Sequence, residues 1–404
     1  MTAIINFSSL YHTRHTLDAT IHPLAYLKEK QLYPKIFWKA KNSSTTLLGL
    51  GEAFSLSHIP TAQDLSTDLP FFGGVFFDPS RCTSPLWEDF SPCKFFVPEI
   101  LITLHPDKTP TLDIYSLEPT PDPSPWMPGS SLHSHLPNTL LEWNHTSSFS
   151  DWKTVVEKAL RCFEKKQLDK VVLARATSCV YKDPIDPYSV LDPMLAHTTS
   201  CTIFGYLPSP KTSFVGATPE MLYERVGNKL CTESLAGTIA KDSDISELFS
   251  NEKLQREFSY VSSCLSDTLS SLCSSYEKSE KKLLKTASLH HLHQTFSGIL
   301  HPWAVDTTIL RTLHPTPAIG GFPKEQAMQF LAEHEPFPRG LYAAPLGWIS
   351  SSQATLCVAI RSTLLVDRIM TLFAGVGVVE GSTAEKEWDE LNCKIAPLLH
   401  LGDP

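Results

Sequence analysis

The sequence predicts an α+β protein, because groups of strands are interrupted by groups of helices without a regular alternation of the two. Short apolar runs between turn residues, typical of β-strands, fill the first part of the chain and return in its last hundred residues. Longer stretches with apolar residues at helical spacing lie between and after them. No internal repeat of about 20 to 50 residues is visible, so a solenoid or a propeller is not expected.

The first part of the chain, residues 1–116, is predicted to be rich in β-structure. Strands are expected at 34–38, 46–51, 71–77 and 95–102. Residues 117–149 are predicted to form an exposed connection, because the stretch 118–128 is too rich in proline to continue a helix or a sheet.

Residues 150–399 form the larger part of the chain. A helix is predicted from Ser150, a plausible N-cap, to about Gln167, and a longer one over 252–275. The last helix is expected over 384–399. Strands are predicted at 170–174, 214–217, 347–349, 355–360 and 370–373.

The composition excludes several classes of function. The net charge of −9 and the lack of a Lys/Arg cluster argue against nucleic-acid binding. The ten cysteines show no metal-ligand spacing, which favours free thiols in a reducing compartment. No signal peptide and no run of about 18 apolar residues is visible. We therefore expect a cytoplasmic protein that does not contact membranes.

Two residues are candidates for acid–base chemistry. Lys170 stands at the start of an apolar run, where a lysine is usually solvated, but in a cleft the loss of water would favour its neutral amine as a general base. Glu220 follows a proline, where a glutamate commonly begins a helix. If Glu220 were instead buried beside the apolar Met221, its pKa would rise and it could act as a general acid.

Three carboxylates are candidates for a metal site. Glu257 lies in the expected long helix, and Glu387 and Glu390 are three residues apart on one face of the last helix, with Lys394 as a possible partner. Acidic residues on helices normally face solvent. If the two faces met, they could hold a hard divalent cation, and Mg²⁺ fits better than Zn²⁺ because no His/Cys set accompanies them.

Further polar residues suggest a site for an anion. The loop 313–321 combines two prolines and two glycines with His314, which suits either a rigid turn or a close approach to a ligand. Arg339 and Arg361 lie beside expected strands, and Gly375 and Gly377 form a Gly-x-Gly segment. Forked guanidinium groups and bare backbone amides both suit carboxylates, although Gly-x-Gly alone is weak evidence.

Together these segments resemble the chorismate-utilising enzymes, a family that comprises isochorismate and salicylate synthases and the large subunits of anthranilate and aminodeoxychorismate synthases. The resemblance covers about 150–399, with KVVLAR, GATPE, LAGT, the Glu257 helix, HHL, LHPTPAIGG, RGLY and AGVGVVEGS in order. Upstream, YPKIFW, LLGLGEA and FFGGVFFD look like the N-terminal part of isochorismate synthases. The resemblance implies one large domain, 1–404, in which two antiparallel sheets pack together with helices outside.

The resemblance also implies a role for each motif residue. Lys170 would activate water for attack at C2 of chorismate, and Glu220 would protonate the departing C4 hydroxyl. Glu257 and Glu390 would be ligands of Mg²⁺, with Glu387 as the nearby acidic residue of the metal site. The residues implied to contact the substrate are Gly237, Thr238, His314, Arg339, Tyr342, Arg361, Gly375, Gly377 and Lys394. Mg²⁺, Arg361 and Lys394 would balance the two carboxylates of chorismate.

Within the family, the chain resembles isochorismate synthases most closely. Anthranilate synthases lack a lysine at the position of Lys170 and use ammonia, so water is the expected nucleophile here and no glutamine amidotransferase subunit is expected. Ala236 stands where aminodeoxychorismate synthases have lysine. The HPTPA segment at 314–318 is shared by isochorismate and salicylate synthases.

The expected reaction is the isomerisation of chorismate to isochorismate, for menaquinone, siderophore or salicylate synthesis, by a monomer or a homodimer. The alternatives are a salicylate synthase, which adds elimination of pyruvate, and a non-catalytic relative that binds chorismate. Two positions differ from the family pattern. Phe258 replaces the usual His after the metal-binding Glu, and Ala344 replaces the last glycine of the usual Tyr-Ala-Gly.

Overall fold

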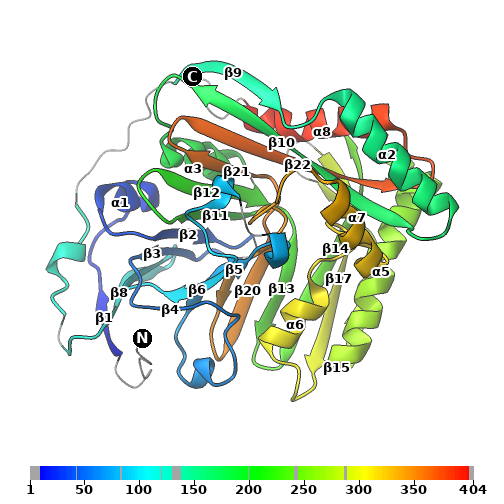
Figure 1. Cartoon of the computed structure of the whole chain (residues 1–404). Helices are drawn as coiled ribbons and strands as arrows, with labels where there is room; N and C mark the ends of the chain where they lie inside the picture. The colour runs from blue at the N-terminus through cyan, green and yellow to red at the C-terminus, as the bar shows by residue number, and fades with distance from the viewer. Residues whose placement is uncertain are drawn as a thin grey trace.

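The two-sheet architecture predicted for the chain is confirmed by its structure, a computed structural model. The structure describes residues 10–399 except 42, 82–83, 120, 130–137, 199, 241–243 and 286–288. Two large antiparallel sheets carry helices on their outer sides, as Figure 1 shows. Within the described residues, no helix is long and apolar enough to cross a membrane.

The first sheet has twelve strands among the described residues, in the order β1-β8-β7-β3-β2-β11-β12-β21-β22-β10-β18, with β9 beside β10. Its strands are β1 Tyr11–Thr16, β2 Lys35–Lys39, β3 Thr46–Leu50, β7 Ile100–His105, β8 Lys108–Ser116, β9 Leu140–His145, β10 Lys170–Tyr181, β11 Thr202–Leu207, β12 Thr212–Thr218, β18 Gly321–Phe322, β21 Ser362–Val366 and β22 Ile369–Val379. The long antiparallel pair β10–β22 lies near one edge and carries several of the predicted site residues.

The second sheet has ten strands among those described, in the order β15-β17-β14-β13-β20-β19-β5-β6-β4, with β16 beside β17. Its strands are β4 Phe54–Leu56, β5 Phe71–Val75, β6 Cys93–Val97, β13 Met221–Val226, β14 Lys229–Ala240, β15 Cys273–Lys278, β16 Lys282–Lys285, β17 Leu289–Leu300, β19 Pro345–Ile349 and β20 Gln353–Val358. The N-terminal strands therefore enter both sheets: β1–β3, β7 and β8 join the first, and β4–β6 join the second.

The helices cover the sheets from outside. Their bounds are α1 Pro23–Glu29, α2 Phe149–Glu164, α3 Pro187–His197, α4 Ser246–Ser250, α5 Glu252–Leu272, α6 Asp306–Leu313, α7 Lys324–His334 and α8 Ala384–Leu399. α2 and α8 pack together beside β22, while α5 packs against β14 and β17 (Figure 1). α5 begins at the N-cap Asn251 and buries an apolar stripe, of which Phe258 and Leu265 are part.

Several predicted boundaries are corrected. The segment 95–102 is two strands and not one, because Pro98 separates β6 from β7 and the two join different sheets. The N-cap of α2 is Ser148 and not Ser150, since Ser148 and Asp151 form a capping box. The expected connection 117–149 contains a strand, β9, that pairs with β10. The long helix ends at Leu272, and the next residue begins β15.

Aromatic side chains fill the space between the two sheets. Phe96 of the second sheet lies 5.9 Å from Tyr206 of the first, measured between ring centroids. Trp87, from the segment between β5 and β6, stacks on Phe373 at 5.8 Å and contacts Phe214 edge-on at 5.4 Å. These buried contacts join both sheets into one core, which fixes the position of β22 and therefore of the site residues that follow Phe373.

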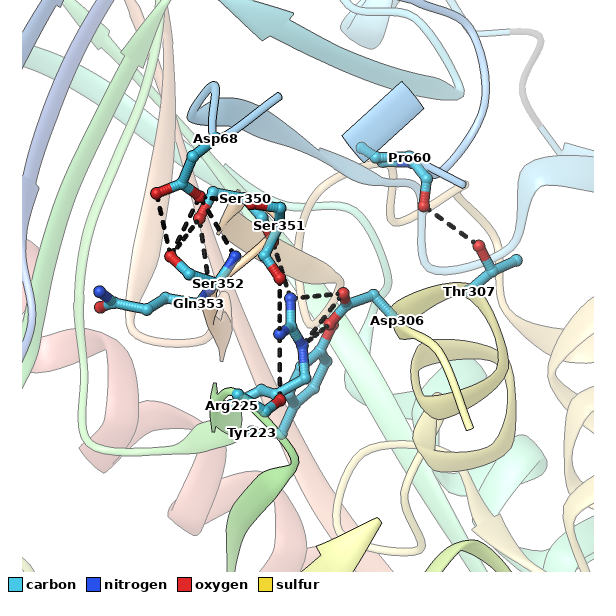
Figure 2. Close-up of polar contacts among 11 residues, drawn as sticks. Pro60, Asp68, Tyr223, Arg225, Asp306, Thr307, Ser350, Ser351, Ser352 and Gln353 are labelled. Atoms are coloured by element: carbon cyan, nitrogen blue, oxygen red, sulfur yellow. Dashed lines mark hydrogen bonds and ion pairs between the residues drawn. The ribbon is translucent and has the colours of Figure 1, made fainter. Parts of the chain in front are cut away.

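A buried polar network holds one end of the second sheet, as Figure 2 shows. The guanidinium of Arg225 donates to both carboxylate oxygens of Asp306 at 2.8–3.1 Å and to three backbone carbonyls at 2.7–3.3 Å. Tyr223 also donates to Asp306, at 3.0 Å. Asp68, from the segment between β4 and β5, accepts hydrogen bonds from Ser351 and Ser352 in the turn between β19 and β20. The network ties this N-terminal segment, α6 and the sheet together.

Candidate active site

A cleft opens between the β10–β22 pair and the strands β14 and β17, beside α5 and α8. It encloses about 790 Å³ of space free of protein atoms, its open mouth included, which suits a small-molecule ligand. The cleft is lined by Val172, Pro219, Glu220, Leu235, Ala236, Thr238, Glu257, His291, Ala318, Ile319, Arg339, Tyr342, Ala343, Ile360, Arg361, Phe373, Ala374, Gly375, Gly377, Glu390 and Lys394. Ten of the predicted site residues are therefore in the lining, while Lys170, Gly237, His314 and Glu387 are not.

Glu220 lies in the turn between β12 and β13, and its carboxyl group faces the cleft. Burial raises the pKa of Glu220 to about 8, with the negative charge of Glu233 adding to the shift and the charges of Lys170 and Lys41 opposing it. No described side chain forms a hydrogen bond with this carboxyl group in the structure. At neutral pH Glu220 is thus a protonated acid that is free to donate to a ligand.

Lys170 begins β10 and is fully buried. Its Nζ donates to Oε1 of Glu257 on α5 at 3.2 Å, and Glu257 itself lines the cleft. Gly377, on the neighbouring strand β22, makes this approach possible, because a Cβ there would lie 2.5 Å from Oε1 of Glu257 and 3.0 Å from Cε of Lys170. Lys170 therefore lies directly behind the carboxylate of Glu257, which lines the cleft.

Arg361 supplies a cation with no protein partner in the described part of the chain. Its guanidinium lines the cleft, and burial is the main cause that lowers its pKa. Its backbone lies in the left-handed region, with φ of 52°, which is uncommon for a residue with a side chain and concentrates at functional sites. Tyr342 lines the same wall and stacks on Phe373 at 5.0 Å. An anionic ligand would provide the hydrogen bonds that Arg361 lacks.

Lys394 and Glu390 extend the charged wall from α8. Nζ of Lys394 donates to the carbonyl of Gly375 at 2.9 Å and forms an ion pair with Oε1 of Glu390 at 2.7 Å. Although burial opposes it, the positive charge of Lys394 helps to lower the pKa of Glu390. Glu390 is therefore an ionised carboxylate in the lining, as is needed for a metal ligand.

Glu387 has a different environment from the other two predicted metal-site residues. It is 1% exposed, and Oε1 accepts a hydrogen bond from Lys253 at 2.6 Å. Burial raises its pKa, against the effect of Lys253. Among the described residues, no group of three or more His, Cys, Asp or Glu could hold a metal ion. The structure thus brings Glu257 and Glu390, but not Glu387, to the wall of the cleft.

His314 and Arg339, two of the residues predicted to bind substrate, are engaged within the protein. Nε2 of His314 lies 3.0 Å from the carbonyl of Phe77, and burial lowers the pKa of His314 to about 3. His314 therefore secures its loop away from the cleft. Arg339 lines the cleft, but its guanidinium binds Glu335 twice at 2.7 Å and donates to the carbonyls of Val172 and Ile319. It holds the walls of the cleft together.

Gly237 shapes the wall without lining it. It has a φ of +67° and stands at a bulge of β14, where the register shifts between Ala236 and Thr238. The bulge turns the strand so that both neighbours face the cleft. Thr238 in turn contacts Nδ1 of His291 on β17 at 3.0 Å.

Sequence reasoning missed four residues around the site. His291 lines the cleft, and its Nε2 has no hydrogen-bond partner among the described residues. The HHL motif marked this position, but the pattern gave it no role. Lys41, Glu233 and His293 form a polar cluster directly behind Glu220. A lysine that reaches this cluster from the first fifty residues leaves no local signal in the sequence.

The two departures from the family pattern both lie outside the lining. Phe258 is 2% exposed in the core side of α5, and the ammonium of Lys281 lies 5.0 Å from its ring centre. Ala344 is fully buried, and its carbonyl accepts a hydrogen bond from the amide of Ala359. Neither side chain changes the residues that the cleft presents.

Comparison with known proteins identifies the family of the chain. Residues 57–401 match the model of the chorismate binding enzyme family. The chain is 30% identical to the isochorismate synthase MenF of Bacillus subtilis, over 94% of this chain and 91% of that protein, and 28% identical to MenF of Escherichia coli, over 94% and 90%. The solved structure of the menaquinone-specific isochorismate synthase MenF of E. coli superposes with a TM-score of 0.87 at 27% identity, covering 98% of this chain and 94% of that one. The chain therefore belongs to the chorismate binding enzyme family.

Proposed function

We propose that this protein is a magnesium-dependent isochorismate synthase of the cytoplasm, which converts chorismate to isochorismate by attack of water at C2 and loss of the C4 hydroxyl. Its similarity to isochorismate synthases over nearly the whole chain supports the choice of reaction. The observation that carries the proposal is one cleft that combines a protonated Glu220, the Lys170–Glu257 pair and an unpaired Arg361. Water serves as nucleophile, so no glutamine amidotransferase subunit is required.

The acid step is assigned to Glu220. When the double bond of the ring shifts and the C4–oxygen bond breaks, the departing hydroxide must receive a proton to leave as water. Glu220 holds such a proton at neutral pH, since its pKa is about 8, and its carboxyl group faces the cleft. An ordinary surface glutamate would be ionised at this pH and could not donate.

The base step is assigned to Lys170. A neutral amine must take the proton of the water that attacks C2. In the structure Nζ of Lys170 points to Glu257, so this hydrogen bond has to be given up before the amine can face a bound water. Gly377 has no side chain, so Glu257 and Lys170 can both lie against its backbone at this place.

The substrate's two carboxylates are assigned to the charged wall. Arg361 can offer a forked pair of N–H donors, and Lys394 adds a second cation held by the carbonyl of Gly375. The backbone of Gly375 and Gly377 borders the same wall. Tyr342 can donate its hydroxyl proton, because burial keeps its pKa above the usual value and the group neutral.

The residues present suit Mg²⁺ through Glu257 and Glu390. Both carboxylates line the cleft, and Mg²⁺ commonly takes one or two protein carboxylates together with water and substrate oxygens. When bound, the ion would supply positive charge that balances a substrate carboxylate. In the structure each carboxylate contacts the Nζ of a lysine, Lys170 for Glu257 and Lys394 for Glu390.

The proposal is tested by incubation of the purified protein with chorismate, with and without Mg²⁺, and chromatography of the products. We expect loss of chorismate absorbance only with Mg²⁺, and isochorismate as the first product. Salicylate and pyruvate as direct products would assign the protein to the salicylate synthases. Binding of chorismate without turnover would make it a non-catalytic relative, and turnover only with ammonia would assign an amino-transferring reaction.

A further inference from the structure

A second carboxylate, Glu233 on β14, lies buried behind Glu220 and outside the lining of the cleft. Its Oε1 forms an ion pair with Nζ of Lys41, and Oε2 lies 2.8 Å from Nε2 of His293 on β17. The amide of Met221, the residue after Glu220, donates to Oε1 at 2.7 Å. Three donors from three parts of the chain therefore hold this carboxylate in one position.

The same cluster fixes the backbone on both sides of Glu220. Lys41 donates to the carbonyl of Pro219, the residue before Glu220, at 2.9 Å, while Glu233 binds the amide of Met221, the residue after it. The carbonyl of Glu220 accepts from the amide of Val358 at 3.0 Å, and its own amide donates to Thr218 at 3.2 Å. Because these hydrogen bonds fix the backbone on both sides of Glu220, its carboxyl group can move only by rotation about the side-chain torsions.

We propose that Glu233 is a positioning residue for the proton donor Glu220: a buried carboxylate, anchored by Lys41 and His293, that fixes the turn at 219–221 and places a negative charge behind the carboxyl group of Glu220. This inference rests on the proposed function, because it assumes that Glu220 is the acid. Nothing in the cluster touches the cleft, so Glu233 acts only through Glu220.

The charges around the pair agree with this division of roles. Although burial opposes it, hydrogen bonds from His293, Lys41 and the Met221 amide lower the pKa of Glu233. Glu220, which has no such donors, has its pKa raised by burial and then by Glu233. The other groups that face Glu220 are Lys170 and Lys41, which lower its pKa, and Tyr342 and Cys357, which are neutral because burial raises their own pKa values. The opposite environments of the two carboxyl groups thus separate their pKa values.

The direct test is the substitution E233Q, read by the pH profile of kcat. Glutamine has the shape of glutamate and can still accept from Lys41 and Met221, so the turn should keep its place, but the negative charge is lost. The pKa of Glu220 then falls. Activity that needs protonated Glu220 is lost as pH rises through this pKa, so we expect the alkaline limb of the profile to move to lower pH by about one unit or more, with KM little changed.

Two further variants separate charge from structure. E233D keeps the charge but withdraws the carboxylate from the Met221 amide, so we expect a lower kcat with the alkaline limb in its wild-type position. E224Q is the matched control. Glu224 on β13 interacts electrostatically with Lys41 and Glu233, but it is not among the groups that shift the pKa of Glu220. The alkaline limb of the E224Q profile should therefore stay at the wild-type pH. If the alkaline limb of the E233Q profile stays at the wild-type pH, the proposal is overturned, whatever happens to kcat.

A second measurement needs neither turnover nor a folded variant at position 233. Infrared difference spectra of the resting protein across the pH range report protonation of carboxyl groups, and the band that E220Q removes belongs to Glu220. We expect Glu220 to lose its proton near pH 8 while Glu233 is already ionised. A Glu220 band that titrates near the ordinary value of 4.5 would overturn the inference. If the protein does not convert chorismate, the proposed function fails while this titration still decides the relation between the two carboxyl groups.

Discussion

Two arginines of this protein, the buried Arg225 and the half-buried Arg361, have opposite surroundings. Arg225 gives its N–H donors to Asp306 and to backbone carbonyls, and its network, drawn in Figure 2, joins parts of the chain that lie far apart. Arg361 lines the cleft and has no hydrogen-bond partner for its guanidinium among the described side chains. A charge that is largely withdrawn from water and has no partner is costly, and folding alone gives no reason to keep it. The comparison separates a charge that holds the fold from one that waits for a ligand.

The same contrast separates the two buried carboxyl groups beside the cleft. Glu233 accepts three hydrogen bonds and is ionised, whereas Glu220 accepts none from the described side chains and keeps its proton. Missing hydrogen bonds therefore mark Arg361 and Glu220 as groups that are left for a ligand. The expected effects of substitutions follow from this contrast, and the largest is expected at Glu220.

The largest effect is expected for E220Q. Glutamine cannot donate a proton to the leaving hydroxyl, so kcat should fall by about 10²- to 10⁴-fold. Stability should not suffer. The folded-state pKa of Glu220 is raised above its ordinary value to about 8, so its contribution to stability in the wild type is present at low pH and is lost as pH rises from about 4.5 to about 8. Glutamine has no such loss, and thermal melts at pH 8 should show E220Q to be at least as stable as the wild type.

A large loss of activity is also expected for R361M. Removing the cation that meets a substrate carboxylate should reduce kcat/KM by roughly 10²- to 10³-fold. Thermal unfolding should show no loss of stability, because the guanidinium has no protein partner to leave unpaired and burial already disfavours its charge. A strong drop in melting temperature with unchanged kcat/KM would mean that Arg361 holds the fold, and the contrast with Arg225 would be broken.

The reverse result is expected for R225M. It leaves Asp306 buried without its ion pair, which should lower the free energy of unfolding by about 3–5 kcal/mol. The protein that remains folded should keep a kcat/KM near the wild-type value, since the network lies outside the cleft. Denaturant titration and initial rates, measured at a temperature where both proteins are folded, check the two statements together. A loss of kcat/KM as large as that of R361M would contradict them.

The fold could be predicted from the sequence where local patterns decide it. The bounds of α8 and the positions of β2, β3 and β5 follow from hydrophobic periodicity, which a chain carries in every short window. The strand predicted over 95–102 failed because periodicity does not show that Pro98 sends the chain from one sheet into the other. The pairing of N-terminal strands with both sheets depends on contacts between distant residues, which no local pattern records.

The site was predictable in part for the same reason. Glu220, Glu257 and Arg361 stand in motifs, so the resemblance could point to them, and the structure brings them to one cleft. Lys41 could not be found, because its role comes from an ion pair with a residue 192 positions away. His314 stood in a motif, but its contact with Phe77 follows from folding and not from the motif. Motifs identify positions, while only the folded chain shows which donors are already in use.

The smallest effect is expected at His314, where the motif and the structure disagree. Its Nε2 contacts the carbonyl of Phe77, and the pKa of about 3 keeps the ring neutral, so it can donate this hydrogen bond but adds no charge to the cleft. H314A should leave the carbonyl unpaired and lower the free energy of unfolding by about 1–3 kcal/mol. The change reaches the cleft only through Phe77, over whose ring the guanidinium of Arg339 lies at 4.2 Å, so KM should change little. H314Q keeps a donor for Phe77 and should recover most of the stability. A large rise in KM in both variants, at wild-type stability, would instead place His314 in contact with the substrate and show that a hydrogen bond within the protein does not exclude a residue from binding.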